Sequence, residues 1–143
     1  MRSIYVAGAS AEACIAEGWM DDLRHRGWTV TSTWTERLKA EKTPDHSLTD
    51  GRRFHHADRD FAEIAVADVF WLLLPSSGLH TTGAWVEYGY AVGLRKHGVG
   101  FGVAVEKIFV SGASSCLFVN SGHASLYPTH RDAFTAINKL LAP

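Results

Sequence analysis

The chain has 143 residues, of which 46% are hydrophobic and 20% are charged, and its formal net charge is −1. This length and composition suit a single domain, residues 1–143, with an ordinary hydrophobic core. The near-neutral charge and the lack of any Lys/Arg-rich run argue against a binder of nucleic-acid polymers or membrane surfaces, since both need a basic surface. Small neutral or singly anionic ligands remain open.

The first residues and the cysteines bear on where the protein works. The apolar run Ile4–Ala7 is too short for a signal peptide or a membrane span. Cys14 and Cys116 stand far apart in apolar surroundings and match no CxxC or metal-binding spacing, which predicts buried free thiols in a reducing compartment. We therefore expect a cytoplasmic protein.

The N-terminal quarter predicts a strand followed by a helix. Ser3–Ala7 is typical of a short buried strand, and the turn at Gly8 lets backbone N–H groups face a ligand. A helix is expected over about Ala11–His25 because apolar residues recur on one face, namely Ile15, Trp19 and Leu23.

The next stretch predicts a strand, a loop and a second helix. Trp28–Trp34 alternates as a strand does. Residues 36–51 are polar and contain Pro44, which predicts a surface loop or a broken helix entry that could act as a lid. A helix is expected over about Arg52–Ala67, with an apolar stripe made of Phe54, Ala57, Phe61 and Ile64.

The second half continues the alternation of strands and helices. Asp68–Leu74 is a continuous apolar run, typical of a central parallel strand covered on both faces. Helices are expected over Gly83 to about Lys96 and over Pro128–Leu141, and strands over Lys107–Gly112 and, more weakly marked, Cys116–Val119. The sequence therefore predicts an α/β fold with a doubly wound sheet of about five mostly parallel strands and helices on both faces.

In such folds ligands bind at the carboxyl ends of the strands. Tyr5–Gly8, Trp34 and Pro75–Gly83 all fall at or just past such ends, so we expect them to surround one cleft. Glu87 would lie in the second turn of the helix that follows, one turn after the small residue Gly83, which leaves room for a ligand. A carboxylate placed there can act as a nucleophile or as an acid/base, as in glycosidic bond cleavage; the alternative is a solvent-facing or structurally paired acid.

Two further side chains can converge on Glu87. Asp60 lies on the flank of the helix that carries the apolar stripe, and it is otherwise expected to be a solvated carboxylate paired with Arg53 or His56. Tyr5 lies in the first strand, where its hydroxyl can approach the carboxylates; it is otherwise a core tyrosine with a satisfied hydroxyl.

A small, polar segment precedes this helix. It contains Ser76, Ser77, Gly78 and His80, and the helix start that follows offers N–H groups and a positive dipole end to a phosphate or a sugar hydroxyl, unless the segment is a plain turn. Trp34 is a candidate for stacking on an aromatic base, with a core position as the alternative.

No metal or cofactor is predicted. The histidines and acids that might suggest a metal match no known ligand spacing, and they are His55, His56, Asp58, Asp60, His80 and His123. The chain also lacks a GxxxxGK[ST] loop and a complete GxGxxG motif, which disfavours ATP or NAD as a ligand.

Four blocks in this order and spacing resemble the nucleoside 2-deoxyribosyltransferase family over nearly the whole chain. They are Ile4–Gly8, Val30–Trp34, Asp60–Asp68 and Gly83–Ala91. The resemblance implies a flavodoxin-like sheet and cleavage of the N-glycosidic bond of a deoxynucleoside or its monophosphate, with retention at the anomeric carbon. It also implies that Glu87 is the nucleophile that forms a deoxyribosyl intermediate, that Tyr5 orients this carboxylate, and that Asp60 serves the sugar or the departing base. A partner subunit commonly completes this family's site, so a homodimer or higher homo-oligomer is expected, with Asn120 as a candidate contribution.

The chain departs from the transferase pattern at two positions. Thr81 stands where the transferases often carry an Asp, and Ala9 replaces the usual proline after the first strand. The turn Pro75–Gly78 is closer to that of the related 2'-deoxynucleoside 5'-monophosphate N-hydrolases, which hold phosphate there with a serine and a glycine. Transfer to another base and hydrolysis both stay open, as do ribose substrates and a catalytically silent nucleotide-binding or sensing module.

Overall fold

The fold is a doubly wound α/β sheet, as predicted. The computed structural model describes residues 2–41, 47–76, 81–97, 105–113 and 122–142 of the chain. Its sheet has the strand order β2-β1-β3-β4-β5, and every strand pair is parallel. The strands are β1 (Ser3–Ala7), β2 (Thr29–Val30), β3 (Val69–Leu73), β4 (Lys107–Ser111) and β5 (Ser125–Tyr127). This is the flavodoxin-like order, in which the chain switches direction between β1 and β3.

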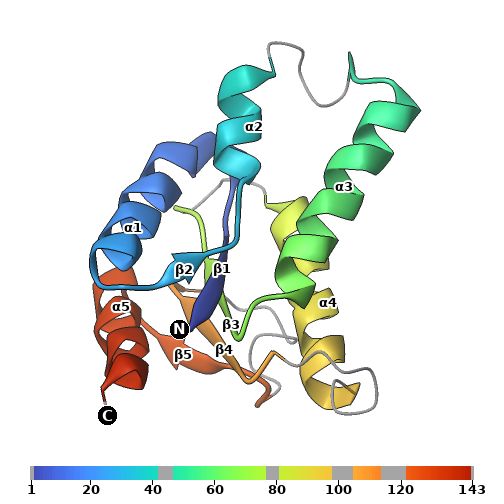
Figure 1. Ribbon diagram of the computed structural model, residues 1–143. Helices are drawn as coiled ribbons and strands as arrows, with labels where there is room; N and C mark the ends of the chain where they lie inside the picture. Colours follow the sequence, from blue (N-terminus) through green and yellow to red (C-terminus); the bar gives the residue numbers. More distant parts are fainter. Residues whose placement is uncertain (1, 42–46, 77–80, 98–104, 114–121, 143) are drawn as a thin grey trace.

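Helices cover both faces of the sheet (Figure 1). The helical segments are η1 (Ser10–Glu12), α1 (Ala13–His25), α2 (Trp34–Ala40), α3 (Asp50–Ala65), α4 (Thr82–His97), α5 (His130–Asn138) and η5 (Lys139–Leu141). Helices α1 and α5 lie on one face and α3 and α4 on the other, while α2 lies beyond the carboxyl end of β1. None of the helices in the described ranges is long and apolar enough to cross a membrane.

The core follows from the alternation of side chains along the central strands. Tyr5 and Phe70 face α4, where their rings stack at 5.8 Å and Phe70 contacts Tyr88. Trp71, the next residue of β3, faces the other way and packs against Trp19 of α1. All five residues of β3 are buried, which confirms the prediction of a central strand covered on both faces.

The predicted strand Trp28–Trp34 is wrong in its second half. Only Thr29 and Val30 pair with β1 as a strand. The Val6 N–H then donates to the Ser32 hydroxyl (3.0 Å), and the Trp34 indole N–H donates to the Val6 carbonyl (2.8 Å). The side chains of Ser32 and Trp34 thus bond the Val6 N–H and carbonyl, which a longer β2 would otherwise have bonded. The backbone after Val30 is then free to turn into α2.

Residues 36–51 were expected to form a surface loop or a broken helix entry, and residues 36–40 are helical and belong to α2; Pro44 lies outside the described residues. Helix α3 begins at Asp50 behind the N-cap Thr49, whose side chain accepts from the Arg52 N–H. The weakly marked strand over residues 116–119 lies outside the described residues. The short strand β5 was not predicted, and α5 begins at His130 rather than at the predicted Pro128.

Four predicted burials are wrong, and one of them is Ala57 of α3, which is exposed. Ile15 is 43% exposed because α1 turns Ala16, Met20 and Leu23 inward. Phe54 is 72% exposed, since the first half of α3 projects past the sheet, which Figure 1 shows. Cys14, expected to be buried, is an exposed free thiol, while Cys116 lies outside the described residues.

Candidate active site

Glu87, Asp60 and Tyr5 come from three elements that meet on the α3/α4 side of the sheet. Helix α4 begins at Thr82, so Glu87 lies in its second turn, as predicted. Tyr5 is fully buried in β1 with its ring toward α4. Asp60 lies on α3, and its charge acts on both Glu87 and Tyr5. The three side chains are therefore close together.

The pKa of Glu87 is raised to about 8. Burial is the largest cause, because an apolar surrounding disfavours the charged form, and the negative charge of Asp60 is the next. The residue is partly exposed as a whole, but protein atoms surround its carboxylate closely enough to remove most of the water. Hydrogen bonding by Tyr5 and the positive charge of Arg37 act in the opposite direction and favour the ionised form.

The Tyr5 hydroxyl lies within hydrogen-bonding reach of the Glu87 carboxylate. The two groups are not aligned as a regular hydrogen bond, so the hydroxyl has no partner of regular geometry among the described residues. Burial first, and then the charges of Glu87 and Asp60, hold the pKa of Tyr5 well above its ordinary range. Tyr5 is consequently a neutral hydrogen-bond donor that faces two acids.

Two charged residues near the site were not predicted. Glu63 accepts the Thr33 N–H (3.0 Å) and the Thr33 hydroxyl, and it thereby joins α3 to the start of α2. Its spacing of three residues from Asp60 puts both on one side of α3, a signal that the sequence does contain. Arg37 was missed because its segment was left open between a surface loop and a broken helix entry.

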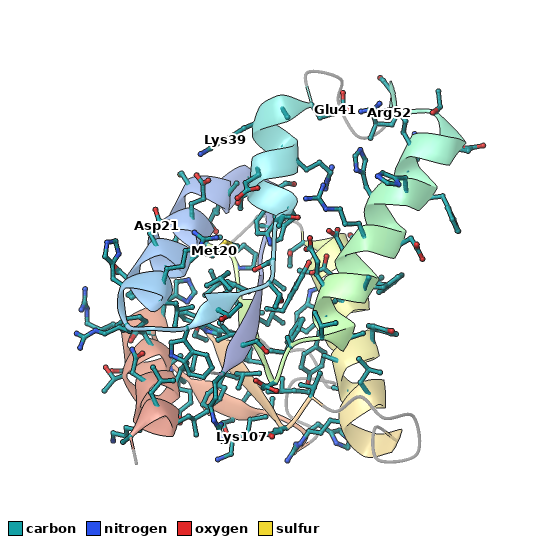
Figure 2. All side chains as sticks on the ribbon, viewed as in Figure 1. Met20, Asp21, Lys39, Glu41, Arg52 and Lys107 are labelled. Carbon is teal, nitrogen blue, oxygen red and sulfur yellow. The ribbon has the colours of Figure 1, made fainter. Side chains whose placement is uncertain are left out.

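Helix α2, which carries Arg37, is tied to its neighbours by ion pairs. Lys39 contacts Glu17 of α1 at 2.7 Å, and Glu41, just after α2, pairs with Arg52 of α3. Figure 2 shows Lys39 pointing outward and Glu41 facing Arg52 across the gap between the two helices. Ion pairs with a solvent-exposed partner stabilise a fold only weakly, so these pairs orient α2 more than they stabilise it.

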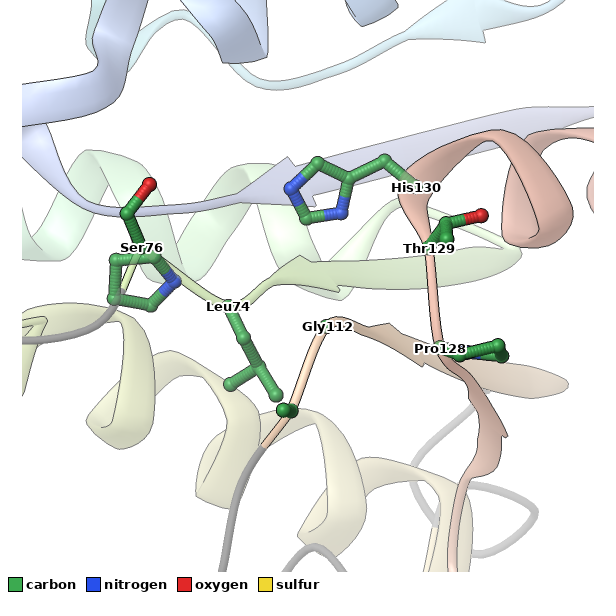
Figure 3. A pocket seen from close by; sticks show the side chains of 8 residues that line it. Leu74, Ser76, Gly112, Pro128, Thr129 and His130 are labelled. Carbon is green, nitrogen blue, oxygen red and sulfur yellow. The ribbon is translucent and has the colours of Figure 1, made fainter.

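The turn after β3 meets the turn after β1. Ser76 donates both its N–H (2.7 Å) and its hydroxyl (3.0 Å) to the carboxylate of Glu12 in η1. A cavity of about 530 Å³ opens beside Ser76; its lining, shown in Figure 3, consists of Leu74, Pro75, Ser76, Gly112, Ala113, Pro128, Thr129 and His130. The remaining residues of the predicted anion site, Ser77, Gly78 and His80, lie outside the described residues.

The other predicted ligand-binding residues differ in their surroundings. Trp34 is 5% exposed and fixed through Val6, so it is a core residue, as its alternative prediction had it. Gly83 is exposed, and among the described residues no other part of the fold comes within 4 Å of the position that its Cβ would take, so α4 has open space there. Gly8 is partly buried next to Leu73 and Trp34, and Asn120 lies outside the described residues.

The arrangement offers the Glu87 carboxylate, the neutral Tyr5 hydroxyl as a donor beside it, and the Asp60 carboxylate nearby. Over the described part of the chain, no three His, Cys, Asp or Glu side chains are grouped so that they could hold a metal ion. This set of groups suits attack on an electrophilic carbon, followed by proton transfer to or from a departing group.

No protein-family model, curated protein or solved structure matches this chain, so the family resemblance rests on the sequence blocks alone.

Proposed function

We propose that the protein cleaves the N-glycosidic bond of a deoxynucleoside, or of a related nucleoside or 5'-monophosphate, through a covalent glycosyl–Glu87 intermediate. It would then be a nucleoside 2-deoxyribosyltransferase or an N-glycoside hydrolase. The observation that carries this proposal is the convergence of the Glu87 carboxylate, the Tyr5 hydroxyl and Asp60 in a largely desolvated place.

Two buried hydroxyl groups support a ligand at this place. The Tyr5 hydroxyl has no partner of regular geometry, and the Thr81 Oγ1 has no hydrogen-bond partner, in the described ranges of the chain. Buried polar atoms are nearly always hydrogen-bonded, and a catalytic role is one reason for exceptions. Tyr5 and Thr81 come from β1 and from the start of α4, the two elements between which the sugar would sit.

The proposed reaction has two displacements at the same carbon. In the first, a Glu87 oxygen bonds to the anomeric carbon while the bond to the base nitrogen breaks, and the base leaves with the electron pair and takes up a proton. In the second, water or another base attacks that carbon and releases Glu87, so the configuration is retained overall. Asp60 is the candidate for proton exchange with the base, because its charge acts on the Glu87 carboxylate.

The raised pKa of Glu87 fits a nucleophile that works on a cationic transition state. A carboxylate with a pKa of about 8 is a stronger base than an exposed one, and the positive charge that develops on the sugar stabilises its ionised form. Tyr5, as a neutral donor, would hold one carboxylate oxygen and leave the other for the attack.

A panel of deoxynucleosides, ribonucleosides and their 5'-monophosphates, with and without an acceptor base, tests the proposal. Chromatography would detect free base as hydrolysis and a new nucleoside as transfer. We expect release or exchange of base by the native protein and a loss of at least about a thousandfold in Glu87→Ala. Glu106→Gln is the matched control, because Glu106 is exposed, pairs with Arg2 and precedes the amino end of β4, whereas the site follows the carboxyl ends of the strands. Full activity in Glu87→Ala would refute the assignment.

A catalytically silent nucleotide-binding module is the second candidate. The observation in its favour is the pKa of Glu87, since a carboxyl with a pKa of about 8 is mostly protonated at pH 7 and then cannot attack. Calorimetric binding of a nucleotide without base release, over long incubation and up to pH 9, would establish this candidate instead.

We also propose that the protein forms a homodimer, as the family resemblance implies. An apolar strip on α3 and α4 supports a second copy as the partner: Phe61 packs on Tyr90 at 4.7 Å, and Val86, one turn before Tyr90, is 56% exposed. Sedimentation equilibrium should give twice the mass of the chain, and Val86→Glu should lower it to that of the monomer. A monomer in the native protein at micromolar concentration would contradict this.

A further inference from the structure

The contact between Ser76 and Glu12 has the form of an occupied anion site. Two donors of one residue, a backbone N–H and a hydroxyl, point at one carboxylate at 2.7 and 3.0 Å. Such paired donors at the carboxyl end of a strand are what a phosphate or carboxylate ligand uses. Here the anion belongs to the protein itself, because η1 carries Glu12 from the end of β1 to the end of the neighbouring strand β3.

The residues around this contact are firmly held. The Trp71 indole N–H donates to the buried Ser111 hydroxyl (2.9 Å), whose oxygen lies 2.6 Å from Nδ1 of His130. Since Trp71 can only donate, the Ser111 hydrogen is available to His130 Nδ1, and the tautomer of His130 decides which of the two groups donates. Figure 3 shows the His130 ring turned into the cavity on the side of Ser76.

Glu12 and His130 also interact electrostatically. Burial lowers the pKa of His130, and the negative charge of Glu12 acts against that and raises it. Both residues line a small pocket between β1, β3 and α1 that adjoins the larger cavity. The Glu12 carboxylate therefore accepts both donors of Ser76 and lines the small pocket together with His130, while Ser76 and His130 also line the 530 Å³ cavity.

We propose that Glu12 is a specificity-determining residue that makes the protein select nucleosides with a free 5'-hydroxyl and reject their 5'-monophosphates. This rests on the proposed function. A neutral 5'-hydroxyl can donate to the Glu12 carboxylate. A phosphate that approached Ser76 would find its two donors already occupied and would meet a like charge, and both effects discriminate against it.

Glu12→Gln is the variant that tests this role, because glutamine keeps the size of the side chain and one acceptor oxygen for Ser76 but removes the charge. We expect the native protein to cleave a deoxynucleoside with a kcat/KM at least about tenfold above that of its 5'-monophosphate. In Glu12→Gln this ratio should fall by at least about tenfold, since a like charge directly opposed to phosphate is removed. Glu12→Asp, which keeps the charge, should retain the preference, and so should the control Glu106→Gln.

A merely structural tie between Glu12 and Ser76 gives a different result. It would lower the melting temperature in Glu12→Gln and leave the ratio of the two kcat/KM values unchanged, which would overturn the proposal. Equal cleavage of both substrates by the native protein would overturn it as well.

A binding experiment separates this proposal from the proposed function. Inorganic phosphate and a deoxynucleoside 5'-monophosphate are titrated by calorimetry into the native protein and into Glu12→Gln, with no turnover required. Binding at least about tenfold tighter in Glu12→Gln supports the role of Glu12 even if no variant releases base, in which case only the proposed reaction fails. Equal affinities of the two proteins refute the role of Glu12 whether or not base is released.

Discussion

Replacing Glu87 by glutamine should change how the stability of the protein depends on pH. The pKa of Glu87 is about 8 in the folded protein, against an ordinary value of 4.5. Between these values the folded state keeps a proton that the unfolded state releases, so the free energy of unfolding falls as pH rises from about 4.5 to about 8. At about 1.36 kcal/mol for each pKa unit, the ionisation of Glu87 costs the folded protein up to about 5 kcal/mol above pH 8.

Urea denaturation at pH 5 and pH 9 measures this cost. Glutamine resembles the protonated carboxyl, so Glu87→Gln should match the native protein within about 1 kcal/mol at pH 5 and exceed it by about 3 to 5 kcal/mol at pH 9. The control Glu106→Gln should follow the native protein at both pH values, because its side chain is exposed. If the difference between Glu87→Gln and the native protein is the same at pH 5 and pH 9, the raised pKa of Glu87 is refuted.

Two further predictions concern the site and the turn after β4. In Tyr5→Phe, which loses the hydroxyl that favours ionised Glu87, the pH at which kcat/KM reaches half of its alkaline plateau should rise by about one unit. In Asp60→Asn, which loses a negative charge that raises the pKa of Glu87, this pH should fall by about one to two units. Shifts of the same sign in the two variants would contradict these electrostatics. Gly112 has a φ of 106°, and a Cβ there would lie 2.9 Å from a side-chain carbon at the end of β3. Gly112→Ala should therefore lower the free energy of unfolding by about 2 to 3 kcal/mol. Gly122→Ala should lower it by only about 1 kcal/mol, because Gly122 has a positive φ but open space around its Cβ position. Thermal unfolding of both variants measures these losses, and equal losses would show that the close contact at Gly112 has no effect.

The fold could be predicted because its determinants are local. The apolar run of β3 identifies a strand covered on both faces, and the alternation of strands and helices then leads to a parallel sheet. The errors at Ile15 and Phe54 have a different origin. The spacing of apolar residues identifies a helix and its apolar stripe. It does not determine how α1 is rotated against the sheet or how far α3 extends past the sheet.

The candidate site was predicted in part for a similar reason. Glu87 and Tyr5 could be named because an acid in the second turn after a strand end, and a tyrosine inside a strand, have definite places in this fold. The contribution of Arg37 and the contact of Glu12 with Ser76 depend on how α2 and η1 dock, which involves segments distant in the sequence. Contacts between segments distant in the sequence produce no periodic pattern, so they could not be predicted from a single sequence.

The capture of a sugar on Glu87 is the most direct test of the account. The protein is mixed with a deoxynucleoside, quenched in acid within milliseconds to seconds, digested, and analysed by mass spectrometry. We predict one deoxyribosyl group on the peptide that contains Glu87, with its attachment mapped to the Glu87 carboxylate, and no such group in Glu87→Gln. Base release without any adduct in the native protein, or an adduct on another residue, would contradict the role of Glu87 as the nucleophile.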